Sequence, residues 1–170
     1  MLHKNNIILF NKASNKTPIF YILIGIPCSG KSFYAKKYLK PQGVVVVSTD
    51  EIRKEYTGTM KFNKELNNEI FDIAVLRIKE RLTMRTNIVF DATNTNKKNR
   101  KALIELGKIY NSKIIAIVIL TPLHVCLRRN KQRDDENRLS EEVLKNYNKS
   151  NLNIDCSEGF DEVININYPY

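Results

Sequence analysis

The segment Gly25–Ser32, with the sequence GIPCSGKS, constrains this chain more than any other part. Its spacing, a glycine followed after four residues by Gly-Lys-Ser, lets successive backbone N–H groups point inward at phosphate oxygens. The apolar run FYILIG leads into it and a helical pattern leads out, which is the context that the motif requires. A glycine turn with a surface lysine is the alternative, but four fixed positions arise by chance in only roughly 1% of chains this long. The segment therefore predicts a loop that binds the phosphates of a nucleoside triphosphate.

The residues of this loop have different expected roles. Lys31 reaches the β- and γ-phosphates as a point charge, and the Ser32 hydroxyl is placed to ligate Mg²⁺. The helix that starts in the loop adds its positive N-terminal end. The other predicted nucleotide-binding residues of the loop are Gly25, Pro27, Cys28, Ser29 and Gly30. The loop thus implies ATP and Mg²⁺ as cofactors.

Five apolar, β-branched runs alternate with helical patterns along the chain. The runs cover residues 20–25, 44–48, 87–91, 113–120 and 162–166. Continuous apolar runs suit strands that are buried on both faces of a parallel sheet. Helices are predicted over 32–40, on the stripe Leu66, Ile70, Ala74 and Ile78, on the stripe Leu103, Leu106 and Tyr110, from Pro122 to Arg133, and from near Ser140. This order predicts an α/β fold, a three-layer α/β/α sandwich with a mostly parallel sheet, in which ligands bind outside the carboxyl ends of the strands.

Asp50 and Arg53 follow the run VVVVS directly, in the group STDEIR. A carboxylate at Asp50 would face the phosphate loop and could accept a proton from an acceptor hydroxyl during phosphoryl transfer. The alternative is that Asp50 only caps the helix that follows. Glu51 is a competing carboxylate, whose side chain is expected to point the other way.

Asp91 follows the run NIVFD, in the group DATNTN. A carboxylate in this place could hold Mg²⁺ directly or through water. Thr93, Asn94 and Asn96 supply further hydrogen-bond donors and acceptors. The alternative is a polar loop that ends in a helix cap.

Arg129 and Arg133 belong to the basic segment CLRRNKQRDDENR, and their spacing of four predicts one shared helix face. Arginines there could clamp the phosphates while a lid around residues 128–150 closes over the nucleotide. The alternative is a solvated charge run, because acidic residues follow at once.

Composition limits the partners and the setting. The net charge is +10, which favours a polyanionic partner such as nucleic acid, although a bias toward Lys, Asn and Ile from AT-rich coding explains it as well. No apolar run approaches the ~20 residues that span a membrane, and the first residues do not form a signal peptide pattern. Three widely spaced cysteines favour a reducing, cytoplasmic setting over a disulfide framework.

Taken together, the motifs resemble those of the polynucleotide 5′-hydroxyl kinase domain of bacteriophage and bacterial type, within the P-loop kinases. GIPCSGKS, TDEIR, DATN and RRNKQR carry the resemblance in that order, and the tail EGFDEVINI is similar to the closing strand of such domains. The resemblance covers roughly residues 19 to 168. It implies a kinase domain over 19–170 after an N-terminal extension over 1–18 of unknown role, and it allows a phage-encoded origin.

The resemblance also implies residue roles. Asp50 would be the base that activates a nucleic-acid 5′-hydroxyl, with Lys31 and Arg133 completing the catalytic set. Arg53 would contact a phosphate of the acceptor strand. Asp91, Thr93 and Asn94 would lie near the acceptor, with Asp91 also near the metal, and Arg129 and Arg133 would be lid arginines on the nucleotide phosphates.

Two other functions stay open at this point. A P-loop kinase for a small molecule or a nucleotide sugar would keep Asp50 as the base but would need a closed pocket. An NTP-binding switch or ATPase without an acceptor would leave Asp50 without a role. The acceptor expected from the resemblance is the 5′-OH end of DNA or RNA.

Overall fold

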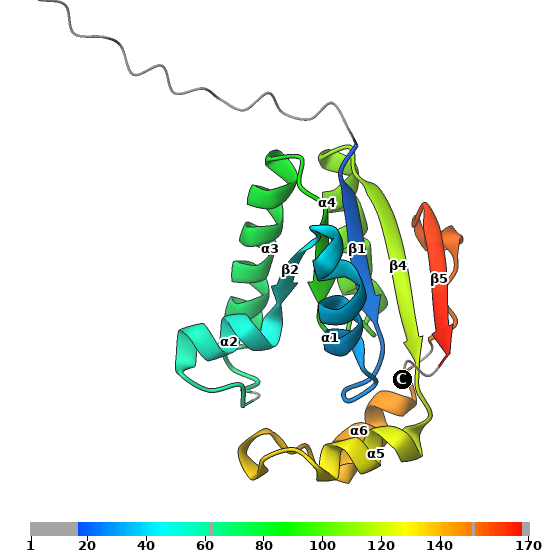
Figure 1. The fold of residues 1–170 in the computed structure, drawn as a ribbon. Helices are drawn as coiled ribbons and strands as arrows, with labels where there is room; N and C mark the ends of the chain where they lie inside the picture. The colour runs from blue at the N-terminus through cyan, green and yellow to red at the C-terminus, as the bar shows by residue number, and fades with distance from the viewer. Residues whose placement is uncertain (1–16, 62, 151, 168–170) are drawn as a thin grey trace, which may run out of the picture.

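The computed structural model describes residues 17–61, 63–150 and 152–167. Nearly all of the expected extension over 1–18 therefore lies outside the described residues. Five strands form one parallel sheet in the order β2-β3-β1-β4-β5 (Figure 1). The strands are β1 (Ile19–Ile24), β2 (Val45–Ser48), β3 (Ile88–Asp91), β4 (Lys113–Leu120) and β5 (Glu162–Asn167). Each end lies within one residue of its prediction, which confirms the strand assignments and the parallel sheet.

Helices fill the connections between the strands. The α-helices are α1 (Lys31–Tyr34), α2 (Thr49–Thr57), α3 (Asn67–Thr83), α4 (Lys97–Ile109), α5 (Leu123–Lys131) and α6 (Glu141–Asn148). The short helices are η1 (Ala35–Leu39), η2 (Lys40–Gln42), η3 (Asp135–Asn137) and η4 (Cys156–Glu158). Two predictions need correction. The helix expected over 32–40 is α-helical for one turn only and continues as the π-helix η1, and α5 ends at Lys131 rather than at Arg133.

The sheet separates two hydrophobic cores, so the three-layer α/β/α architecture is confirmed. On one face, apolar side chains of α3 and α4 pack against alternate residues of β1, including Phe20 and Ile22. On the other face, Ala35 and Leu39 of η1 pack against Leu23 of β1. In Figure 1, α1 lies in front of the sheet and α4 behind it. All four residues of β3 and six of β4 are buried, which is why these strands read as continuous apolar runs.

The sheet register brings distant polar residues together. β2 and β3 pair so that Ser48 lies opposite Asp91, at the carboxyl ends of both strands. α2 begins one residue after Ser48, so Asp50 comes close to Asp91. α5 and α6 pack on each other below these strand ends (Figure 1), and each has a buried apolar side chain, Val125 in α5 and Leu144 in α6. Within the described part of the chain, no helix is both long and apolar enough to cross a bilayer.

Candidate active site

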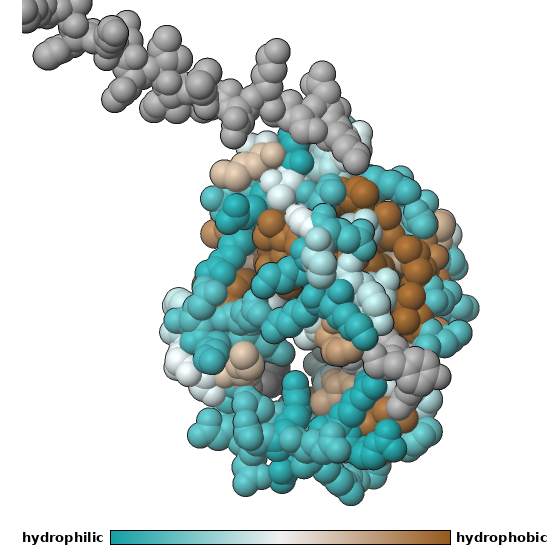
Figure 2. Space-filling model, in the orientation of Figure 1, coloured by the Kyte–Doolittle hydropathy of each residue, from teal (hydrophilic) through white to brown (hydrophobic). Residues whose placement is uncertain are grey.

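A cavity of about 1050 Å³ lies at the carboxyl ends of the strands, between the phosphate loop, α2, the loop after β3, and the segment from α5 to α6. In Figure 2 it is the hollow between the body of the molecule and its lower helices. The predicted site residues in its wall are Pro27, Cys28, Gly30, Lys31, Ser32, Asp50, Arg53, Asp91, Thr93, Asn94, Arg129 and Arg133. The structure thus brings nearly all the candidates into one cavity, although they come from four separate parts of the sequence.

Gly25 and Ser29 are the candidates that do not line this cavity. A Cβ on Gly25 would lie 2.9 Å from the carbonyl oxygen of Ile119, so the residue must be glycine for the loop to pass β4. Ser29 is fully buried, and its carbonyl oxygen accepts a hydrogen bond from Thr121 Oγ1 at 2.7 Å. Both residues shape the phosphate loop rather than line the cavity.

The phosphate loop turns through left-handed backbone at two positions. Gly30 has φ 106° and Cys28 has φ 64°, a conformation that is uncommon for a residue with a Cβ. Burial raises the pKa of the Cys28 thiol, although the charges of Arg133, Lys31 and Arg129 oppose the shift. A raised pKa disfavours the thiolate, which is the reactive form of cysteine.

The Lys31 ammonium lies inside the loop. Its Nζ donates to the carbonyl oxygens of Gly25 at 3.0 Å and Ile26 at 2.8 Å. Burial lowers the pKa of Lys31, whereas the carboxylates of Asp91 and Asp50 oppose that shift. The Lys31 ammonium thus lies within electrostatic range of two carboxylates, those of Asp91 and Asp50.

Ser32 and Asp91 form the predicted metal position. The Ser32 hydroxyl is hydrogen-bonded to the Asp91 carboxylate. Burial raises the pKa of Asp91, while Ser32 and Lys31 lower it. No cluster of three or more His, Cys, Asp or Glu side chains among the described residues could hold a metal alone. A single carboxylate with a hydroxyl suits Mg²⁺, which is bound by one or two carboxylates together with substrate phosphates and water.

Asp50 lies in the first turn of α2 and is half exposed to the cavity. The cap of α2 is Ser48, whose side chain accepts from the Glu51 N–H, so the capping alternative for Asp50 is wrong. Asp50 Oδ1 instead receives a hydrogen bond from Nη1 of the buried Arg53 at 2.6 Å. As expected, Glu51 points elsewhere and pairs with Lys36 at 3.3 Å.

The loop after β3 is fixed to the sheet by its own polar groups. The Gly25 N–H donates to the Thr93 carbonyl oxygen at 3.0 Å. Asn94, with φ 49°, donates from Nδ2 to the Leu23 carbonyl oxygen at 2.7 Å. Asn96 caps α4, as the alternative for this loop anticipated. Asn94 therefore uses its amide nitrogen to hold the loop, and it lines the cavity together with Asp91 and Thr93.

Arg129 and Arg133 both line the cavity, but they do not share a helix face. Arg129 lies in α5, and its Nη1 donates to the carbonyl oxygens of Cys28 at 3.2 Å and Ser29 at 3.0 Å. Arg133 lies beyond the end of α5, with Nη1 donating to the Asn137 carbonyl oxygen at 3.3 Å. The prediction of one face fails because the helix ends two residues before Arg133.

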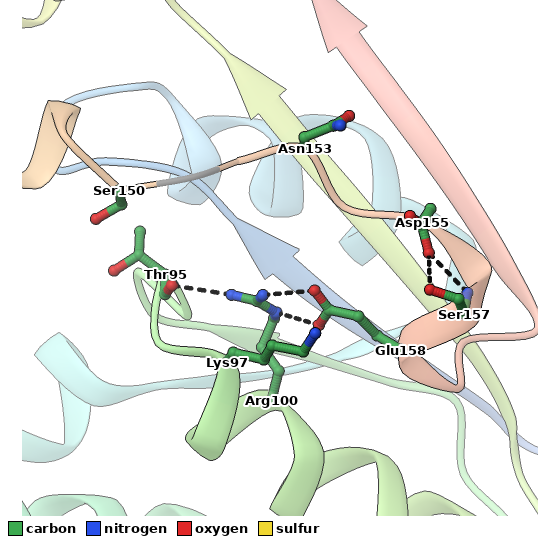
Figure 3. A pocket seen from close by; sticks show the side chains of 8 residues that line it. All are labelled: Thr95, Lys97, Arg100, Ser150, Asn153, Asp155, Ser157 and Glu158. Atoms are coloured by element: carbon green, nitrogen blue, oxygen red, sulfur yellow. Dashed lines mark hydrogen bonds and ion pairs between the residues drawn. The ribbon is translucent and has the colours of Figure 1, made fainter.

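Two residues that organise the site were not among the sequence candidates. Asn130 is buried and holds the loop between α5 and α6, since it donates to the Leu139 carbonyl oxygen at 2.7 Å and accepts from the Leu139 N–H at 3.1 Å. Arg100 is buried behind the loop that follows β3 and pairs with Glu158 (Figure 3). Both are polar residues on otherwise apolar helix faces, and that was the signal available in the sequence.

The comparisons with known proteins agree with this geometry. The model of the AAA_33 family, described as an AAA domain, matches residues 20–151. The chain belongs to this family. The AAA_33 match includes the phosphate loop, Asp50, Asp91, Arg129 and Arg133.

Two curated proteins are similar to this AAA_33 chain. The L-seryl-tRNA(Sec) kinase of Methanococcus maripaludis is 28% identical over 134 residues, which are 74% of this chain and 49% of that protein. A protein named as a bifunctional polynucleotide kinase/RNA ligase, from Autographa californica nuclear polyhedrosis virus, is 23% identical over 150 residues, which are 81% of this chain and 21% of that protein. The chain thus spans about half the length of the first relative and about a fifth of the second.

A solved structure described as a kinase from Chloroflexus aurantiacus shares the fold. The TM-score is 0.71 at 12% identity, and the match covers 91% of this chain and 90% of that one. The chain thus belongs to the AAA_33 family and has a P-loop kinase-like fold, which implies ATP and typically Mg²⁺.

Proposed function

We propose that this protein is a polynucleotide 5′-hydroxyl kinase, which transfers the γ-phosphoryl group of ATP to the 5′-OH end of DNA or RNA. The observation that carries the proposal is that Asp50 lies half exposed in the same cavity as the phosphate loop, with Arg53 beside it. A carboxylate in this place can take the proton of a hydroxyl that attacks the γ-phosphate.

The phosphate loop, Asp91 and two arginines bind the ATP phosphates and the metal in this proposal. Lys31 binds the β- and γ-phosphates, for which it exchanges its bonds to the carbonyl oxygens of the loop. Ser32 and Asp91 would hold Mg²⁺, which would neutralise charge on the phosphates. Arg129 and Arg133 lie on the lid side of the cavity and contact the nucleotide phosphates.

The acceptor approaches from the α2 side. Asp50 takes the proton of the 5′-hydroxyl as that oxygen bonds to the γ-phosphorus and the bond to the β-phosphate oxygen breaks, which releases ADP. Arg53 offers its guanidinium to the phosphodiester beside the reacting hydroxyl. The net charge of +10 suits a polyanionic acceptor. The names of both curated relatives also include a nucleic acid.

A kinase for a small molecule or nucleotide sugar is the second candidate. It is favoured by the apolar side chains of Met60, Phe71 and Val143 in the cavity wall, which suit a compact acceptor. A nucleotide switch without an acceptor is the third, and it gives Asp50 no role.

One experiment separates the three. The protein is incubated with γ-labelled ATP, Mg²⁺ and either a 5′-OH oligonucleotide, the same oligonucleotide with a 5′-phosphate, or a panel of nucleosides, sugars and seryl-tRNA. The proposal expects label in 5′-OH strands and none in 5′-phosphorylated strands. Label only in a small molecule or in seryl-tRNA would refute it, and release of free phosphate with no labelled acceptor would favour the switch.

A further inference from the structure

An aromatic and basic surface covers the outer side of α1 and η1. Phe33 and Tyr38 are 46% and 40% exposed, and their rings meet edge to face with centroids 6.5 Å apart. Tyr34 packs on Tyr38 at 5.1 Å. Lys37 Nζ lies 5.1 Å from the Phe33 ring centroid and 5.4 Å from that of Tyr38. We call Phe33, Tyr34, Lys37 and Tyr38 the aromatic platform.

The backbone is shaped to assemble this platform. Phe33 and Tyr38 are five residues apart, a spacing that an α-helix would place on different faces. η1 is a π-helix, in which the Lys40 N–H donates to the Ala35 carbonyl oxygen, so residues five apart come together. Meanwhile Ala35 and Leu39 remain buried in the core. π-helical turns are rare and occur frequently at functional sites.

The platform begins at the edge of the active-site cavity. Phe33 lines the cavity together with Lys31, Ser32 and Asp50. Lys36, on the same short helical segment, pairs with Glu51, the neighbour of Asp50, and this places the platform beside α2. A chain whose 5′ end reaches Asp50 can therefore continue onto the platform.

Charge and ring chemistry identify the partner. Lys36, Lys37 and Lys40 are exposed, and the segment 31–42 has no acidic residue. Exposed aromatic rings beside lysines match single-stranded nucleic acid, in which bases stack on the rings and phosphates meet the ammonium groups.

We propose that the aromatic platform binds bases of the acceptor strand that follow its 5′-terminal nucleotide. The inference rests on the proposed function for the identity of the acceptor. It goes beyond that function by making affinity depend on strand length, because a short acceptor reaches Asp50 without covering Tyr38.

The test compares Tyr38→Ala with Tyr38→Phe, which keeps the ring, and with Leu76→Ala, which removes an exposed apolar side chain from α3. KM is measured for a 5′-OH dinucleotide and for a single strand of about twelve nucleotides. Tyr38→Ala is expected to raise KM for the longer strand at least about five-fold, since one stacked base is worth that much or more. It should leave KM for the dinucleotide, KM for ATP and kcat unchanged, and Tyr38→Phe and Leu76→Ala should behave like the parent protein. An equal KM of parent and Tyr38→Ala for the longer strand would overturn the platform while leaving the kinase proposal intact.

A direct binding measurement distinguishes the platform proposal from the kinase proposal. Fluorescence anisotropy of a labelled single strand is measured without ATP, with the parent and the same variants. If the parent phosphorylates no strand, the proposed function fails, yet weaker strand binding by Tyr38→Ala than by Tyr38→Phe still supports the platform. Equal strand binding by Tyr38→Ala and Tyr38→Phe, or no strand binding by the parent, refutes the platform proposal.

Discussion

Arg100 and Glu158 form a buried bidentate ion pair between the start of α4 and the segment that precedes β5. Arg100 donates to the two carboxylate oxygens at 2.8 and 2.7 Å, and the two side chains are only 3% and 9% exposed. Its Nη1 also donates to the carbonyl oxygen of Asn94 at 3.0 Å. The same atom donates to the carbonyl oxygen of Thr95 at 2.9 Å (Figure 3). One guanidinium therefore ties the loop that follows Asp91 to the segment between α6 and β5.

Removal of one partner of this pair should be costly. Glu158→Ala leaves the Arg100 charge buried beside two carbonyl oxygens, and loss of one member of a buried pair costs about 3–5 kcal/mol of unfolding free energy. The free energy is measured by urea unfolding. Lys113→Ala, which breaks the exposed pair of Lys113 with Glu162, is the matched control and should change little. A Glu158→Ala protein as stable as this control would mean that the pair does not hold the loop.

Asp50→Asn should abolish transfer but not nucleotide binding. The amide keeps the size of the side chain but cannot take the hydroxyl proton, so kcat should fall by about 10² to 10⁴. ATP affinity should change little, because Lys31 and the loop remain. Transfer is measured with labelled ATP, and ATP binding is measured by calorimetry. Glu51→Gln is the control, since Glu51 does not line the cavity and pairs with Lys36, and it should keep parental turnover. A turnover for Asp50→Asn close to that of the parent would mean that Asp50 is not the general base.

Much of this fold could be predicted from local pattern. Strands β3 and β4 are buried on both faces, so their apolar runs gave the boundaries and the parallel sheet. Asp50 and Asp91 could be placed in one site because the carboxyl ends of parallel strands share one edge, and the Ser48–Asp91 register confirms their proximity. These predictions succeeded because they depend only on apolar runs that alternate with helical patterns and on the order of these elements along the chain.

The features that could not be predicted from the sequence depend on tertiary contacts. α5 ends one residue after Asn130, whose side chain is hydrogen-bonded to Leu139, nine residues later, and helix periodicity does not contain that information. Arg100 meets Glu158 across 58 residues of sequence. The π-helical turn of η1 places Phe33 and Tyr38 together against the α-helical pattern that was predicted. In each case, tertiary packing overrode the local preference.

The raised pKa of Asp91 makes stability depend on pH. Because burial raises this pKa in the folded protein, the folded state holds its proton more strongly than the unfolded chain does. Unfolding free energy without Mg²⁺ should therefore fall as pH rises from the ordinary aspartate pKa of about 3.9 through the raised value. Asp91→Asn should remove this slope, whereas Asp72→Asn, at an exposed position on α3, should keep it. Urea unfolding over a pH series measures both, and an unchanged slope in Asp91→Asn would contradict the assignment.

Replacement of Arg129 and replacement of Arg133 should change different kinetic constants. Arg129 contacts the phosphate loop directly, so Arg129→Ala should weaken ATP binding and raise KM for ATP. Arg133 lies on the loop after α5, and an arginine on the transferred phosphoryl group acts mainly in the transition state. Arg133→Ala should therefore lower kcat about 10³-fold or more, with an unchanged melting temperature. Lys131→Ala is the control, because Lys131 is exposed and pairs with Glu141. Steady-state kinetics on the three variants test this prediction. A parental kcat in Arg133→Ala would mean that the loop after α5 is only a solvated run of charged residues.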